Sequence, residues 1–364
     1  MEGQLALAMF VAVCFALLAG FPVALTLGGT ALGFASLGIL LGHFDPDYLT
    51  ALTARIFGTM GNETLVAVPL FIMMGVTLER AKIAEDLLSH MAGLFGARPG
   101  GLGVAVVVVG ALLAASTGIV GATVITMGVL ALPTMLRAGY HPQLATGTIC
   151  ATGTLGQIIP PSIALVLLGD IMSAAYQQAQ LRMNIINTQT VSVGDLFVGA
   201  MVPGFLLVVF YLAYLLIRAA LQPTSAPAAA VDHTEFGAAM TAVLPPVGLI
   251  ALVLGSILVG AATPTEAAGV GAVGAMTLAL SRGALTPTSL RDISRSTLYT
   301  TSMVFLILIG AAVFSLVFRG FGGDLLIESF FEELGGGPHA ALLVVMLVMF
   351  FSASFLTLLR SLSS

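Results

Sequence analysis

The chain has 364 residues, of which 58% are hydrophobic and only 8% are charged, and its formal net charge is −5. A soluble domain carries about 25% charged residues, so this composition excludes a soluble globular protein and predicts an all-α polytopic membrane protein. Nothing in the sequence supports nucleic-acid binding. Two cysteines, Cys14 and Cys150, lie in apolar runs and are expected to be small buried side chains without a disulfide.

Apolar runs long enough to enter a bilayer recur along the whole chain, since about 20 residues span the hydrocarbon core. They lie near 4–41, 63–79, 102–136, 144–169, 198–218, 237–280, 297–318 and 339–358. The first run is nearly two spans, with a joint expected at Gly20-Phe21-Pro22, and the run at 237–280 is expected to divide at residues 261–264. Residues 1–20 lack a basic segment and a cleavage site, so they predict a membrane helix and not a signal peptide.

The run at 102–136 allows three interpretations: one long helix, two helices, or a span followed by a re-entrant hairpin. Its middle is crowded with small and hydroxyl residues around Ser116-Thr117-Gly118. Such residues suit a simple helix contact, and they equally suit the tip of a hairpin buried in protein.

The run at 144–169 contains Thr152-Gly153-Thr154-Leu155-Gly156-Gln157-Ile158-Ile159-Pro160-Pro161-Ser162. Two adjacent prolines remove two backbone donors, and the glycines before them weaken the helix. In lipid, unpaired backbone is tolerated only where it is buried in protein or lines a polar cavity. A structural kink is the simpler interpretation. The freed carbonyls, with the hydroxyls of Thr152 and Thr154, favour a broken helix that holds Na⁺.

A polar segment at 170–197 is expected to lie outside the membrane, and residues 220–235 form the one clear linker. The linker divides the chain into a first repeat, 1–219, and a second, 236–364. Short matches between the two keep a nearly constant offset: residues 20–24 pair with 262–266, 71–75 with 306–310, and 97–100 with 336–339.

Loop charges give an independent test of the repeat, because basic loops tend to be cytoplasmic. Loop 80–98 is rich in basic residues and its counterpart 319–337 in acidic ones, whereas loop 42–62 is acidic and its counterpart 282–295 basic. Counterpart loops are therefore expected on opposite sides of the membrane. An inverted-topology repeat with interrupted helices is typical of secondary transporters.

Glu266 is the one carboxylate well inside an apolar run, and an intramembrane acid is a functional candidate. Pro264 and Thr265 before it indicate a helix N-terminus, where an acid is also favoured by the helix dipole. The five histidines are scattered through loops, and no catalytic or phosphate-loop motif occurs. The sequence therefore predicts a protein that is not an enzyme.

The motifs together resemble the large membrane subunit of TRAP (tripartite ATP-independent periplasmic) transporters, of DctM type. The resemblance covers about residues 4–350 and depends on four segments in this order: Val68-Pro69-Leu70-Phe71-Ile72-Met73-Met74-Gly75, Ser116-Thr117-Gly118, Ile158-Ile159-Pro160-Pro161-Ser162 and Thr263-Pro264-Thr265-Glu266-Ala267-Ala268.

The resemblance implies an elevator-type secondary transporter of the bacterial inner membrane, driven by a Na⁺ gradient and importing organic acids. It implies two partners, a small DctQ-type membrane subunit and a periplasmic DctP-type solute-binding protein. The first re-entrant hairpin would lie at about 112–136 and the first broken helix at 144–168. The ion-site candidates that it transfers to this chain are Ser116, Thr117, Gly118, Thr152, Gly153, Thr154 and Gly156.

The end of the chain departs from the family pattern, because a second hairpin and a second Pro-Pro break are absent. A frameshift within residues 350–364 would explain this, and it predicts a truncated chain that does not transport. Two other functions remain open: a stand-alone inverted-repeat anion:Na⁺ symporter, and a membrane scaffold that transports nothing. Co-purification with a small membrane subunit would separate the first of these from a TRAP permease.

Overall fold

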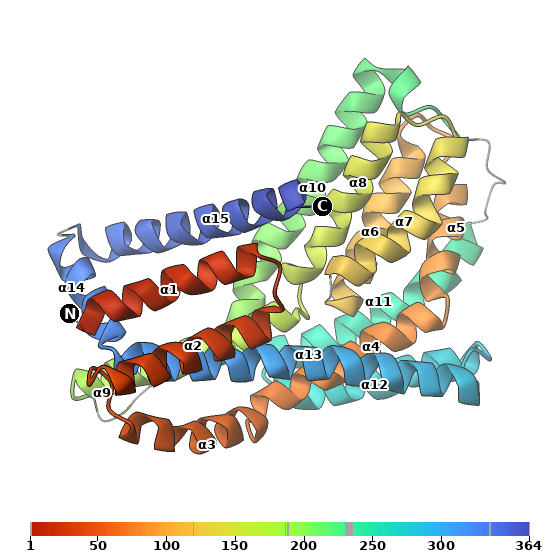
Figure 1. The fold of residues 1–364 in the computed structure, drawn as a ribbon. Helices are drawn as coiled ribbons and strands as arrows, with labels where there is room; N and C mark the ends of the chain where they lie inside the picture. The colour runs from red at the N-terminus through yellow and green to blue at the C-terminus, as the bar shows by residue number, and fades with distance from the viewer. Residues whose placement is uncertain are drawn as a thin grey trace. The chain divides into compact units, whose positions relative to one another are not determined.

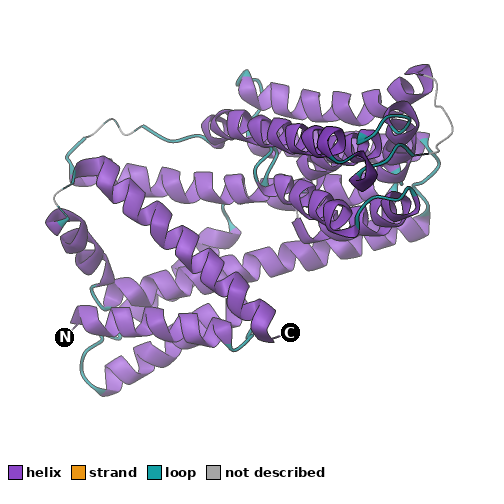
Figure 2. Ribbon diagram, turned by 90° about the horizontal axis from the view of Figure 1, so that it is seen from above, coloured by secondary structure: helices purple, strands orange, loops and turns teal. Residues whose placement is uncertain are grey.

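Backbone donors and acceptors in a bilayer must be paired within the protein, and a helix pairs all of them within one segment. The computed structural model describes residues 2–118, 120–185, 187, 189–229, 236–334 and 336–363. Side chains not described within these ranges are those of Glu2, Ala84, Ser116, Thr117, Ala122, Phe236, Ala238 and residues 352–363. Over the described part of the chain every regular element is helical (Figure 2), as the composition predicts.

Figure 1 shows the α-helices in chain order. They are α1 (Glu2–Leu18), α2 (Val23–Leu40), α3 (Asp47–Met60), α4 (Ala67–Arg80), α5 (Ile83–Phe95), α6 (Gly101–Thr117), α7 (Val120–Arg137), α8 (Pro142–Thr154), α9 (Ile163–Arg182), α10 (Val193–Leu221), α11 (Phe236–Leu258), α12 (Pro264–Ser281), α13 (Pro287–Gly320), α14 (Gly323–Glu333) and α15 (Gly337–Ser363). Three 3₁₀ turns accompany them: η1 (Thr64–Val66), η2 (Leu155–Gln157) and η3 (Pro223–Ser225).

Both expected joints are confirmed, since α1 ends before Gly20 and α11 ends before residue 261. Three further helices, α3, α5 and α14, lie between the apolar runs. Four described helices are long and apolar enough to cross a membrane: Val23–Leu40, Val193–Leu221, Ala239–Leu258 and Pro287–Gly320.

The expected burial of the two cysteines needs correction. Both cysteines are free, as predicted, but Cys150 is exposed and Cys14 half-buried, because apolar side chains of a membrane protein need not face its interior. Over the first part of the polar segment at 170–197, α9 continues to Arg182. The Gln180 side-chain amide donates to the Gln189 carbonyl at 2.9 Å, and its oxygen accepts the Gln189 N–H at 2.8 Å, so Gln189 lies against this helix.

The linker at 220–235 is fixed over its first half. The Ser225 carbonyl accepts the His141 N–H at 3.0 Å, and the Ala226 carbonyl accepts the Gly100 N–H at 2.9 Å. Gly100 and His141 are the N-cap residues of α6 and α8, so the linker satisfies donors that a helix start leaves unpaired. Residues 230–235 of the predicted linker lie outside the described residues.

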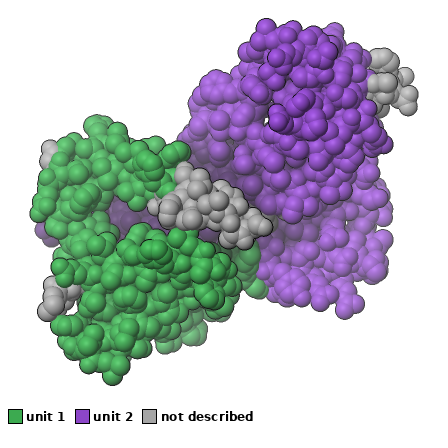
Figure 3. Space-filling view, turned by 45° about the horizontal axis from the view of Figure 1, so that its top comes forward, with its two compact units in different colours: residues 1–62, 302–364 green, residues 63–301 purple. Residues whose placement is uncertain are grey.

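The chain forms two compact units, coloured separately in Figure 3, and they do not coincide with the two predicted repeats. Unit 1 contains Met1–Asn62 and Ser302–Ser364, and unit 2 contains Glu63–Thr301. Each unit therefore combines segments from both sides of the linker.

Within each unit the same pattern of packing occurs. In unit 1, α1 packs against α2, α14 and α15, and in unit 2, α11 packs against α12, α5 and α6. Residues with a positive φ at helix ends also form four pairs that are 237–241 positions apart in sequence. The pairs are Gly20 with Gly260, Gly42 with Gly283, Lys82 with Gly322, and Gly100 with Gly337. The spacing is close to the offset of the short sequence matches between the two halves.

In unit 2, helices α4 and α12 pack closely against each other and run parallel. Thr265 bonds the Glu63 carbonyl at 2.9 Å at their N-terminal ends, and Arg80 and Arg282 share one cavity at their C-terminal ends. Small buried residues of α12 let the two helices approach closely, as at many membrane helix contacts. They are Ala267, Ala268, Gly271, Ala272, Ala275 and Ala279.

This packing predicts different outcomes for one substitution at two positions of α12. A Cβ at Gly271 would lie 2.6 Å from Met74 Sδ and 3.0 Å from Val253 Cγ2, whereas a Cβ at Gly269 meets only Leu70 Cδ1 at 4.0 Å. We expect Gly271→Ala to destabilise the protein by about 1–2 kcal/mol through overpacking. Gly269→Ala is the matched control and is expected to be neutral or slightly stabilising. Thermal unfolding of the purified proteins in detergent measures both, and equal midpoints would contradict this account.

Candidate functional site

Helices α6, α7 and α8 lie side by side in unit 2, and each packs against the other two (Figure 1). The run at 102–136 therefore contains two helices, and they meet at Gly118 in a helical hairpin. Gly118 has φ +60°, a left-handed conformation that glycine adopts without strain, and its N–H bonds the Ala114 carbonyl at 3.2 Å. The side chains of Ser116 and Thr117 lie outside the described residues.

The helix that follows is interrupted at the segment predicted from its glycines and prolines. α8 ends at Thr154, η2 occupies Leu155–Gln157, and α9 begins at Ile163. The Ser162 side chain caps α9 by accepting the Leu165 N–H at 3.4 Å, and its hydroxyl donates to the Gln157 carbonyl at 2.8 Å. Ser162 thus replaces a donor that Pro161 cannot supply to Gln157.

The interruption is enclosed by protein. Leu155 and Ile159 are buried in one apolar cluster with Ala114 and Ala115 of α6 and Ile250 of α11. Pro160, Pro161 and Ser162 are also buried. This burial satisfies the condition under which irregular backbone is tolerated at membrane depth.

The hairpin tip and the interruption are joined by one side chain. The Gln157 amide donates to the Gly118 carbonyl at 2.9 Å across 39 residues of sequence. A Cβ at Gly156 would lie 3.2 Å from the Ala114 carbonyl oxygen, so the backbones of η2 and α6 are in close approach. The structure therefore brings Gly118 and Gly156 into one region.

Two predicted ion-site residues on α8 have packing roles that need no ion. A Cβ at Gly153 would lie 3.2 Å from the Cα and N atoms of Val124, so glycine permits α7 and α8 to touch. Thr152 is fully buried. A Cβ at Gly110 would lie only 2.3 Å from the Thr152 methyl group, so the Thr152 side chain fills the space beside this glycine of α6.

The threonine hydroxyls at the end of α8 bond to their own helix. Thr152 Oγ1 donates to the Thr148 carbonyl at 2.6 Å, and Thr154 Oγ1 donates to the Ala151 carbonyl at 2.7 Å. Each oxygen keeps lone pairs, because the hydroxyl uses only its proton in these bonds. Thr154 is exposed, unlike its neighbours, so its oxygen is accessible from outside the helix.

Glu266 lies in the first turn of α12 and forms a capping box with Thr263. Its carboxylate accepts the Thr263 N–H and hydroxyl, both at 2.8 Å, and its own N–H bonds Thr263 Oγ1 at 3.3 Å. Glu266 also lines an open cavity with Glu63 and Asp170. Its bonds are those of a helix cap, so the geometry gives it a structural role.

Sequence reasoning missed two residues at this site, Gln157 and Ser162. Gln157 is the only amide side chain in residues 146–161, and an amide is unusual in such an apolar run. Ser162 directly precedes an apolar helix, and this is a recognisable N-cap position. Both signals were present in the sequence.

Comparison with known proteins places the chain in a family. Residues 6–362 match the family described as Tripartite ATP-independent periplasmic transporter, DctM component. The C4-dicarboxylate TRAP transporter large permease protein DctM of Vibrio cholerae is 32% identical over 198 residues, which cover 54% of this chain and 39% of that protein. The protein of the same name from Pseudomonas aeruginosa is 33% identical over 225 residues, covering 62% of this chain and 48% of that protein.

The matched segments thus span less than half the length of these relatives. Among solved structures, the crystal structure of the YdaH transporter from Alcanivorax borkumensis has a similar fold, with a TM-score of 0.56 at 16% sequence identity. The likeness covers 86% of this chain and 72% of that one. The family match over nearly the whole sequence shows that the chain is a member of the DctM family, the large permease subunits of TRAP transporters in the bacterial inner membrane.

Proposed function

We propose that the chain forms the permease part of a Na⁺-driven TRAP transporter, which imports an organic acid delivered by a periplasmic solute-binding protein. The observation that carries this proposal is the contact between the hairpin tip at Gly118 and the interrupted helix at Gln157. An ion site of a secondary transporter is commonly built from interrupted helices, whose carbonyls and hydroxyls replace the hydration shell of Na⁺.

The oxygens available in this region are neutral. Pro160 has no N–H and cannot donate to the Gly156 carbonyl, which a continuous helix would have paired. The hydroxyl of Thr154 is exposed beside it in sequence. We propose that the Na⁺ ligands come from Ser116, Thr117 and Gly118 of the hairpin and from Thr152, Gly153, Thr154 and Gly156 of the interrupted helix.

The recurrence of backbone conformation supports an inverted repeat. Left-handed residues at helix ends recur at an almost constant spacing, and the packing of α1 in unit 1 follows that of α11 in unit 2. In an elevator mechanism the hairpin and the interrupted helix would carry the bound solute across the membrane together. Their mutual contact through Gln157 suits such joint movement.

The substrate and partners are proposed from the relatives. Two DctM-family proteins similar to this chain are named as C4-dicarboxylate permeases, which supports a small organic acid, such as a dicarboxylate, as solute. In TRAP systems a DctQ-type membrane subunit and a DctP-type binding protein complete the transporter, and we propose both as partners of this chain.

The ion site predicts Na⁺-dependent stability that depends on one hydroxyl. We expect NaCl to raise the unfolding midpoint of the purified chain above its value in choline chloride at equal ionic strength, because an ion that binds only the folded state stabilises it. Thr154→Val should raise the half-saturating Na⁺ concentration by about tenfold, the effect of losing one polar contact worth roughly 1.4 kcal/mol.

Thr146→Val provides the matched control for this experiment. Thr146 is exposed on the same helix, and its hydroxyl bonds the Pro142 carbonyl at 2.9 Å in the same way. It should retain the Na⁺ response in full. Equal stabilisation by Na⁺ and choline in the unaltered protein would exclude a sodium site here.

The TRAP assignment also predicts a stable complex. The chain, expressed together with a DctQ-type and a DctP-type protein from the same organism, should retain the small membrane subunit through affinity purification in mild detergent. Isolation without that subunit, combined with Na⁺-driven anion uptake by the chain alone in liposomes, would instead support the stand-alone symporter.

A further inference from the structure

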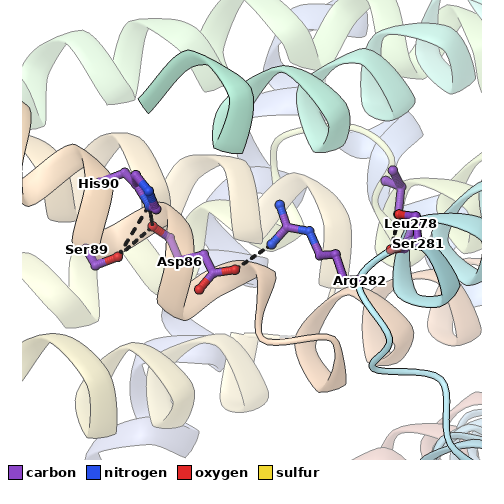
Figure 4. A network of polar contacts seen from close by, with 6 residues as sticks. All are labelled: Asp86, Ser89, His90, Leu278, Ser281 and Arg282. Atoms are coloured by element: carbon purple, nitrogen blue, oxygen red, sulfur yellow. Dashed lines mark hydrogen bonds and ion pairs between the residues drawn. The ribbon is translucent and has the colours of Figure 1, made fainter. Parts of the chain in front are cut away.

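A cavity of about 670 Å³ in unit 2 is surrounded by cationic side chains, and the transport proposal uses none of them. It lies where α4 and α12 end and α5 begins. The residues around it are Arg80, Ala81, Lys82, Asp86, His90, Thr241, Ala242, Arg282 and Ala284. Figure 4 shows Arg282 reaching from the end of α12 toward Asp86 on α5.

The basic residues come from segments far apart in sequence. Arg80 is in the last turn of α4, Lys82 is the N-cap residue of α5, and Arg282 is the C-cap residue of α12. Because α4 and α12 run parallel, their C-terminal ends meet at this cavity. Two basic loops that are distant in the chain, 80–98 and 282–295, are thereby brought together.

Positive charge exceeds negative charge around the cavity. Arg282 Nη1 pairs with Asp86 Oδ2 at 2.6 Å, and the Arg282 side chain is only 24% exposed. Arg80 and Lys82 are exposed, and within the described part of the chain neither makes an ion pair. One carboxylate therefore faces three permanent cations.

Helix electrostatics explain only part of this arrangement. An arginine at a helix C-terminus is favoured by the helix dipole, and this accounts for Arg80 and Arg282. It does not account for Lys82, which is at the N-terminus of α5 in a left-handed conformation with φ 56°. α5 also has no side-chain cap, so its first N–H groups add donors at the same end.

His90 adds a further polar atom. Its Nδ1 lies 2.6 Å from the Asp86 carbonyl, which accepts only, so Nδ1 carries the proton in this bond. The second ring nitrogen, Nε2, is then left for another partner. Thr241 of α11 also lines the cavity.

We propose that this cavity binds an anionic phosphate group. Arginine presents a planar fork of donors that matches phosphate oxygens, and lysine supplies a compact charge. Two sources carry this chemistry, a phospholipid headgroup and a soluble phosphate compound.

The surroundings of the cavity suit the lipid source. Met240 and Leu244, one turn apart on α11 and next to Thr241, are 39% and 64% exposed, so acyl chains can lie along this face. Basic loops are typical of the cytoplasmic side, and a headgroup there would add to the electrostatic attraction between such loops and anionic lipid.

The test measures the unfolding midpoint of the full chain, purified in an uncharged detergent. Additions are phosphatidylglycerol, diacylglycerol with the same acyl chains, and inorganic phosphate. We expect phosphatidylglycerol to raise the midpoint more than diacylglycerol does. The double variant Arg80→Gln/Lys82→Gln should raise the half-saturating lipid concentration at least about tenfold, because it removes two charge-assisted hydrogen bonds to the headgroup.

Arg98→Gln/Arg291→Gln is the matched control, because it removes two exposed cations from the same pair of loops but outside the cavity. It should keep the response to phosphatidylglycerol. Arg80→Lys, which keeps the charge, should retain part of the rise in midpoint with phosphatidylglycerol. A retained rise would show that substitution at this position leaves the site folded.

Each outcome decides the proposal. Stabilisation by inorganic phosphate alone, lost in Arg80→Gln/Lys82→Gln, supports the site and assigns it to a soluble phosphate. Equal stabilisation by diacylglycerol and phosphatidylglycerol overturns it, as does an undiminished response in Arg80→Gln/Lys82→Gln or an equal loss in the Arg98 and Arg291 control.

Discussion

A polar backbone group inside a bilayer must find its hydrogen-bond partner within the protein. At the interruption between α8 and α9, side chains and neighbouring helices meet this requirement in place of a continuous helix. The Gln157 amide, the Ser162 hydroxyl and the enclosing residues of α6 and α11 supply the partners and the burial. The same enclosure holds the interruption against the hairpin tip at Gly118. An open break in lipid would leave the same groups unpaired, at several kcal/mol each.

The position of the interruption could be predicted from residue types, but proline alone does not explain it. Pro245 and Pro246 form a second adjacent pair, and they lie inside the continuous helix α11. The difference lies in the residues around each pair. Gly153 and Gly156 precede the first pair, and each allows a backbone contact with a neighbouring helix that a Cβ would crowd. The hydrogen bond from Gln157 to Gly118 joins residues 39 positions apart, and no local pattern predicts such a pairing.

The proposed repeat also shows how little the sequence alone reveals of the packing. Residue matches between the two halves are weak, because many apolar side chains fill a helix equally well, whereas the left-handed helix ends at Gly42 and Gly283 recur in backbone conformation. The sequence could not show that each compact unit draws helices from both halves, since all of these helices share one composition. Packing between small residues decides it. Gly310 of α13 lies against the Ala24 backbone of α2, as Gly271 of α12 lies against Met74 of α4.

The linker carbonyls that bond Gly100 and His141 have a consequence for the order of events during synthesis. Helices α6 and α8 leave the ribosome long before Ser225 and Ala226, so their first turns must wait for acceptors that are more than 80 residues away in the chain. Domains form in N-to-C order as they are made. These two hydrogen bonds therefore form only after α10 has been made, and a nascent chain that ended before Ser225 would hold α6 and α8 without these two acceptors.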